Sequence, residues 1–143
     1  MTRVLVVANE TVEATELLAE LRRIEDEHSS TFVVVAPAVA AEHGLADTWT
    51  QAGAIDAAQE RLDRTLAVLR SEGLECSGWV GDMVPFAAVR DALDRFDAEL
   101  IVISTHPVTR SRWLRKDLVE QVRSHFDIPV VHIVSHVHEQ PGV

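Results

Sequence analysis

Four short runs of the chain are apolar almost throughout, and they restrict the fold more than any other feature. β-branched residues dominate these runs, and polar residues do not alternate with the apolar ones. Strands that are buried on both faces have this composition, which is typical of a parallel sheet covered by helices. The four runs are VLVVA (Val4–Ala8), FVVVA (Phe32–Ala36), LIVIS (Leu100–Ser104) and VVHIV (Val130–Val134).

A fifth run, LECSGWV at residues 74–80, has a different pattern. Leu74, Cys76 and Val80 fall on one side of an extended chain, whereas Glu75 and Ser77 fall on the other. Alternation of this kind predicts a strand at the edge of the sheet.

Amphipathic helices are predicted between the strands, because apolar residues recur there at the spacing of one helix face. Gly73 is expected to end the second helix. Gly81 and Asp82 are expected to turn the chain and cap the third, with Pro85 in its first turn. The apolar positions are Ala14, Leu17, Leu18, Leu21 and Ile24, then Ala58, Leu62, Leu66 and Leu69, then Phe86, Val89, Leu93 and Phe96, then Leu114, Leu118, Val122 and Phe126.

Strands and helices therefore alternate along the chain, and its 143 residues suit one domain. Right-handed crossovers give an α/β fold, an open doubly wound five-stranded parallel sheet with helices on both faces. The strand order 3-2-1-4-5 fits, because it puts the alternating third strand at an edge. We predict a single domain over residues 1–143, with a frayed tail at 136–143.

The loop after the fourth strand is the predicted binding site. Ligands of such sheets bind past the carboxyl ends of the strands where the order reverses, here between strands one and four. Residues 103–116 contain several cations and no acid, although the whole chain has a formal charge of −10. Hydroxyls, guanidinium groups and the free N–H groups of the next helix together suit an anion. The candidate nucleotide- or anion-binding residues are Asn9, Ser104, Thr105, Arg110, Ser111, Arg112, Arg115 and Lys116.

Structural explanations of the same residues stay open. The arginines also fit ion pairs with carboxylates such as Asp117 and Glu120, or a solvated surface. A cation at a helix N-terminus is slightly unfavourable, which weakens a purely structural explanation. Asn9 also fits a strand end or a helix cap.

Several functional classes lack their motifs. The turn after the first strand reads ANETVEAT and holds no dinucleotide fingerprint, and no P-loop occurs. No nucleophile elbow surrounds Ser104, so His106 is expected to be a loop histidine and no catalytic residue is predicted. His132, His136 and His138 share one side of an extended chain, but a terminal tail rarely builds a metal site, and none is predicted. Cys76 is the single cysteine and is expected to be a small buried side chain.

Composition also limits partners and location. A net charge of −10 and a pI near 5.0 argue against nucleic-acid binding. Neither a signal peptide nor a membrane span is visible, which predicts a cytoplasmic protein. The last run carries no charge besides His132, so an exposed edge there predicts a homodimer. The predicted interface residues are Val130, Val131, His132, Ile133 and Val134.

The whole pattern resembles the universal stress protein family, from RVLVVANET to IPVVHIV. GDMVPFAAVRDAL resembles the segment before the family's third helix, AELIVIST its fourth strand, and LVEQVRSHFDIPVVHIV its last helix and strand. Residues 104–118 also resemble the STxPxxxSRWLRxDL signature of a divergent actinobacterial branch. The resemblance implies the family's fold and a dimer formed through the last strand.

The resemblance carries less weight for ATP. ATP-binding members use Gly-x-x-Gly, a spacer, and then Gly followed by Ser or Thr. Here Ser104 and Pro107 stand at the first two glycine positions, and Lys116 and Asp117 stand near the last pair. Pro107 has no N–H to donate. Arginine side chains are therefore expected to replace the glycine backbone as anion ligands.

Three functions follow as hypotheses. The leading one is a non-catalytic stress or regulatory protein that binds an ATP- or AMP-type nucleotide, or phosphate, and requires no cofactor. The second is a ligand-free interaction or dimerisation module that docks an acidic partner through the basic loop. The third is an enzyme that hydrolyses nucleotide slowly.

Overall fold

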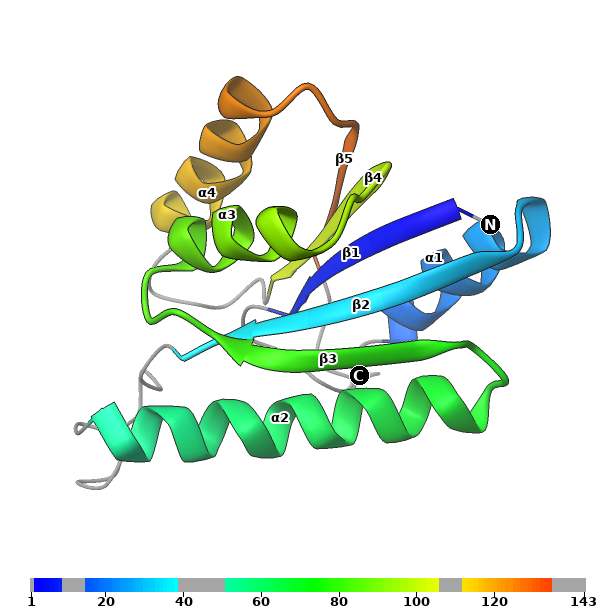
Figure 1. The fold of residues 1–143 in the computed structure, drawn as a ribbon, viewed down its shortest axis with the longest axis horizontal. Helices are drawn as coiled ribbons and strands as arrows, with labels where there is room; N and C mark the ends of the chain where they lie inside the picture. Colours follow the sequence, from blue (N-terminus) through cyan, green and yellow to red (C-terminus); the bar gives the residue numbers. More distant parts are fainter. Residues whose placement is uncertain (1, 9–14, 39–50, 106–111, 135–143) are drawn as a thin grey trace, which may run out of the picture.

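A computed structural model describes residues 2–8, 15–38, 51–105 and 112–134 of the chain (Figure 1). Strands and helices alternate along the described residues, as predicted. The elements are β1 (Thr2–Ala8), α1 (Thr15–Glu27), β2 (Ser30–Pro37), α2 (Gln51–Ser71), β3 (Cys76–Gly81), α3 (Pro85–Arg95), β4 (Leu100–Thr105), α4 (Arg112–His125) and β5 (Val130–Val134). The predicted frayed tail at 136–143 lies outside the described residues.

The five strands form one parallel sheet in the order β3-β2-β1-β4-β5. The predicted fold class and strand order are both confirmed. β1 lies in the middle, whereas β3 and β5 are the edges. The alternating run therefore does become an edge strand.

Each central strand contributes to two cores, one on either face of the sheet. Val4, Val6 and Ala8 of β1 pack with α1 and α2, whereas Leu5 and Val7 pack with α3 and α4. All five of these side chains are fully buried. Burying a side chain of this size stabilises the fold by roughly 1.5–3 kcal/mol, so selection for apolar residues acts on both faces. This is why the strand runs show no polar alternation.

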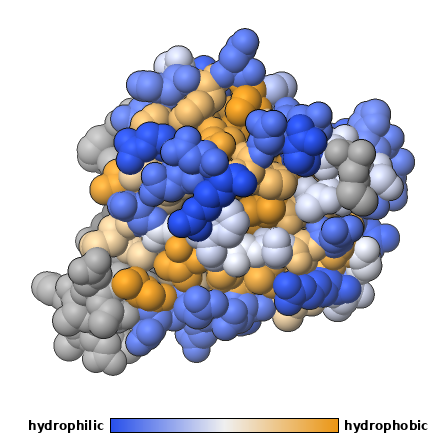
Figure 2. All heavy atoms as spheres, in the orientation of Figure 1, coloured by the Kyte–Doolittle hydropathy of each residue, from blue (hydrophilic) through white to orange (hydrophobic). Residues whose placement is uncertain are grey.

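The helices bury the faces that their spacing predicts. Leu17, Leu21 and Ile24 of α1 are buried, and so are all four predicted positions of α2. Phe96 follows α3 in an extended conformation and still packs against the core of that face. Between the helices, hydrophobic residues show among the hydrophilic ones on the face drawn in Figure 2.

Two helix ends depend on their turn residues. Gly73 has a φ of +82°, and its N–H donates to the Arg70 carbonyl at 3.0 Å. The Leu74 N–H donates to the Leu69 carbonyl at 3.1 Å, which completes the predicted C-terminal stop of α2. Asp82 behaves differently from the prediction. Its Oδ1 accepts the N–H of Val84 at 2.9 Å, so Asp82 turns the chain, and Val84 is the N-cap residue without a side-chain bond.

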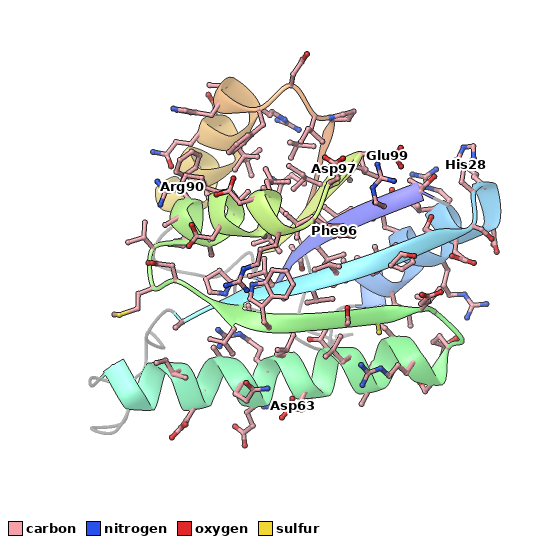
Figure 3. All side chains as sticks on the ribbon, viewed as in Figure 1. His28, Asp63, Arg90, Phe96, Asp97 and Glu99 are labelled. Carbon is pink, nitrogen blue, oxygen red and sulfur yellow. The ribbon has the colours of Figure 1, made fainter. Side chains whose placement is uncertain are left out.

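Contacts at the amino ends of β1 and β4 fix the register of these two strands. The N–H of Arg3 donates to Glu99 Oε1 at 3.0 Å, and the N–H of Glu99 donates to the Arg3 carbonyl at 2.8 Å. The Arg3 guanidinium also donates to the Asp97 carbonyl. Asp97 and Glu99 lie together just before β4 (Figure 3). This register determines which residues meet at the opposite, carboxyl edge.

Gly81 is required where α3 crosses the end of β3. A Cβ at this position would lie 2.8 Å from Ala88 Cβ and 2.8 Å from Val35 Cγ2. Both neighbours belong to packed elements and are buried. Only a residue without a side chain allows α3 to approach the sheet this closely.

We expect Gly81→Ala to lower the free energy of unfolding by about 1–3 kcal/mol, the usual cost of overpacking. Ser77→Ala is the matched control, because Ser77 is an exposed residue of the same strand. It should change stability by less than about 0.5 kcal/mol. Urea denaturation of both variants checks this, and equal stability of the two would contradict the packing argument.

Candidate functional site

The carboxyl ends of β1 and β4 form a switch point. Ala8 pairs with Ser104 in the register of these neighbouring strands. The chain runs from β1 to α1, which covers one face, and from β4 to α4, which covers the other. Because the two connections leave toward opposite faces, the strand ends between them are not covered by a crossover helix. Ser104 and the backbone of Thr105 lie at this place.

Ser104 is fully buried at this edge, between Ala8 of β1 and Ile133 of β5. It shares its side of the sheet with Val102, which packs in the core with α1 and α2. Side chains alternate along a strand, so Ser104 belongs to the face opposite α4. The structure therefore puts Ser104 at the predicted mouth, but on the other side of the sheet from the helix that carries the cations.

The backbone of α4 starts at Arg112, and its first turn contains no acid. Leu118, Val119 and Val122 are the buried residues of this helix. Position 115 precedes them by three, four and seven residues, so it lies on the sheet-facing stripe of the helix. Among the cationic positions of the first turns, 115 is the closest to the middle of that stripe.

Several predicted site residues cannot be placed. Asn9, Arg110 and Ser111 lie outside the described residues, as do the side chains of Thr105, Arg112, Arg115 and Lys116. Thr105 is described through its backbone, which ends β4 and pairs with Val134 of β5. The roles assigned to these residues stay predictions.

Sequence reasoning missed one cation at the carboxyl edge of the sheet, Arg61 of α2. Its guanidinium donates to the carbonyl of Pro37, the last residue of β2, at 3.1 Å. The next residue, Ala38, donates its N–H to the Asp82 carbonyl at 3.2 Å. Both contacts hold the end of β2 beside the mouth. The sequence feature that could have pointed to Arg61 is its position next to Leu62, in the apolar stripe of α2 that also contains Ala58.

Within the described ranges, no group of three or more His, Cys, Asp or Glu residues is arranged to hold a metal ion. His132 is half-buried in β5, whereas His136 and His138 lie outside those ranges. In the same part of the chain, no helix is long and apolar enough to cross a membrane.

Cys76 is half-buried at the start of β3 and is not fully buried as expected. Its Sγ lies 3.8 Å from the Leu66 carbonyl of α2. Burial raises the pKa of the thiol above its ordinary value, and this outweighs the opposing effect of the nearby Arg70 cation. A raised pKa leaves little thiolate at neutral pH, which makes Cys76 a poor nucleophile.

We expect Cys76 to react slowly with a disulfide reagent in the native protein, because the thiolate is the reacting form. The rate should rise as the pH increases through the raised pKa, and unfolding in urea should accelerate the reaction. Arg70→Gln should slow the native reaction further, because it removes a charge that lowers the pKa of the thiol. A native rate equal to the unfolded rate would contradict this assignment.

The strand order and the switch point define the fold class, the doubly wound α/β proteins with a parallel sheet. No family model matches the chain, and no curated protein matches it in sequence. Solved structures do match. The universal stress protein from Archaeoglobus fulgidus is 20% identical, with a TM-score of 0.62 over 93% of this chain and 98% of that one.

Two further similar structures were solved with a nucleotide. The Arabidopsis thaliana family member with AMP bound is 15% identical, with a TM-score of 0.62 over 99% of this chain and 97% of that one. A universal stress protein in complex with cAMP is 16% identical, with a TM-score of 0.55 over 94% of this chain and 98% of that one. The chain therefore has the fold of the universal stress proteins, which confirms at the level of the fold the resemblance seen in the sequence.

Proposed function

We propose that this chain is a non-catalytic universal stress protein that binds a nucleotide or a small anion at the mouth between β1 and β4. The observation that carries the proposal is the pairing of Ala8 with Ser104 at the carboxyl ends of β1 and β4, from which the chain continues to the basic start of α4 at Arg112. Similar folds that hold AMP or cAMP support a nucleotide as the ligand class. The actinobacterial branch, the absence of catalysis and a cytoplasmic location remain part of the proposal.

Charge distribution supports an anionic ligand. The sequence of α4 contains four cations and two acids, whereas α1 contains five acids and two cations. The whole chain is acidic, so an anion is repelled elsewhere and attracted locally. Position 115 lies on the sheet-facing stripe of α4, which makes Arg115 the strongest single candidate for the contact.

Arg115→Ala should weaken anion binding by about 1.5–3 kcal/mol, the range for a hydrogen bond to a charged group. Arg115→Lys should restore only part of the binding, because an ammonium is a point charge and not a planar fork. Calorimetry with ATP, AMP, cyclic AMP and phosphate measures the affinities. We expect ATP to bind more weakly than micromolar, because Pro107 has no N–H to donate and Asp117 brings a negative charge close to any phosphate.

Arg90→Ala is the matched control, because Arg90 is an exposed cation of α3 on the outside of the molecule (Figure 3). It should leave anion binding unchanged. If Arg115→Ala binds anions as the wild type does but lowers stability, the structural explanation of these cations is correct. If no anion stabilises the wild-type protein against heat, the binding proposal fails.

The basic start of α4 also favours the second candidate, a ligand-free module that docks an acidic partner. An acidic protein surface and a nucleotide would both bind to the same cations, but the protein surface is much larger. Such docking would be weakened by Arg112→Ala and Arg115→Ala without any small anion binding to the wild-type protein. Slow nucleotide hydrolysis is the third candidate, and no arrangement of described residues favours it.

We also propose a homodimer through β5. This strand is an edge of the sheet, and Val130, Val131, His132 and Ile133 are half-buried. Antiparallel pairing of two such edges forms a closed two-fold dimer. Sedimentation at micromolar concentration should show a dimer, and a charged residue in this edge strand (Ile133→Asp) should dissociate it. A wild-type protein that is only monomeric would contradict the proposal.

A further inference from the structure

The two edge strands each present backbone groups away from the sheet. The N–H of Phe32 donates to the Glu75 carbonyl at 3.0 Å, so Glu75 faces β2. The backbone N–H and C=O groups of successive residues in a parallel strand point to opposite sides of the strand. Those of Cys76, Gly78 and Val80 therefore point away from β2, toward the outer edge of the sheet. On the other edge, the N–H of Ile101 donates to the Pro129 carbonyl at 3.0 Å. By the same alternation Val130, His132 and Val134 face outward.

An arginine covers the first outward carbonyl of each edge strand. Arg70 donates to the Cys76 carbonyl at 3.2 Å, and Arg123 donates to the Val130 carbonyl at 3.1 Å. Both arginines lie in the last turn of the helix that leads into the strand. Both are exposed, so each guanidinium lies at the open edge of the sheet.

The other two helices provide an internal comparison, because they lead into the central strands β2 and β4. α1 has no basic residue in its last turn. α3 has Arg95, which lies 5.1 Å from the centre of the Trp79 ring on β3 and does not bond to β4. Among the described residues, arginine capping of the next strand therefore coincides with the two edges. Arg95 adds a second cation beside the β3 edge.

We propose that Arg70 and Arg123 are edge guards, residues that prevent a strand of a second copy from pairing with the amino half of β3 or β5. An added strand needs the outward carbonyl as a hydrogen-bond acceptor. It would also have to occupy the space beside the edge strand in which the guanidinium lies. It would have to displace a charge-assisted hydrogen bond and approach a cation. Such a second copy is the expected partner, because both exposed edges belong to every molecule.

The guards do not cover the whole edge. Gly78 and Val80 of β3 lie beyond Arg70, and His132 and Val134 of β5 lie beyond Arg123. Any pairing through β5 therefore leaves out the Val130 carbonyl, which Arg123 already occupies. Without the guard on β3, pairing at both edges would link molecules into open chains, because each molecule would then have two adhesive edges.

Removal of each guard tests the proposal. Arg70→Ala should self-associate with a dissociation constant at least about tenfold lower than that of the wild type, measured by sedimentation over a concentration series. Hydrogen exchange should then show new protection at the N–H groups of Gly78 and Val80. Arg123→Ala should likewise self-associate more tightly than the wild type.

Arg64→Ala is the matched control, because Arg64 is an exposed arginine of the same helix whose partner is Glu60 at 3.9 Å. It should associate as the wild type does. Association of Arg70→Ala at the wild-type level would overturn the proposal, and so would association without protection at Gly78 and Val80.

If Arg70→Ala does not fold, the Arg70→Gln variant tests the proposal instead, because glutamine keeps a hydrogen-bond donor and loses the charge. Wild-type behaviour of that variant would overturn the guard role, and the β3 result is independent of any dimer through β5.

Discussion

The position of β1 in the middle of the sheet is the constraint on which the rest of the structure depends. β1 is hydrogen-bonded to β2 on one side and β4 on the other, and its apolar residues from Val4 to Ala8 are buried on both faces. A strand in this position must be covered by helices on both faces. The chain meets that requirement by sending its two halves in opposite directions from β1, and the reversal leaves the switch point at the carboxyl ends.

The amino ends and the carboxyl ends of β1 and β4 differ in the contacts that they make. At the amino edge, Arg3 and Glu99 exchange backbone and side-chain hydrogen bonds and fix the register of β1 against β4. That register brings Ala8 beside Ser104 at the carboxyl edge, where the chain leaves for α4. The contacts that fix the register and the proposed binding site therefore lie at opposite ends of the strands.

The sequence allowed the strand order and the core to be predicted because burial on two faces leaves a direct trace in composition. Three of the four apolar runs became the central strands and the fourth became the edge strand β5, whereas the alternation at residues 74–80 identified the other edge. Turn chemistry was less certain: Asp82 accepts a hydrogen bond from Val84 instead of capping α3. The site was predictable only as a place, because side-chain partners depend on packing that no local pattern records. Arg61, which reaches the end of β2 from α2, is an example.

The two edge strands show that the sequence of a strand alone does not reveal how its edge is protected. VVHIV carries no lysine and no proline, so by its own sequence it is an unprotected edge. In the folded protein the cation comes from α4, seven residues earlier in the chain, where Arg123 reaches the Val130 carbonyl. The same arrangement at β3 comes from Arg70, six residues before Cys76. Arginine suits this task because its stem crosses the turn while its planar head keeps several donors at the strand. A cation in the last helical turn also interacts favourably with the helix dipole, so the guard stabilises the helix that carries it. Protection of an edge can therefore be encoded in the preceding helix, which leaves the strand itself free to be apolar on both faces.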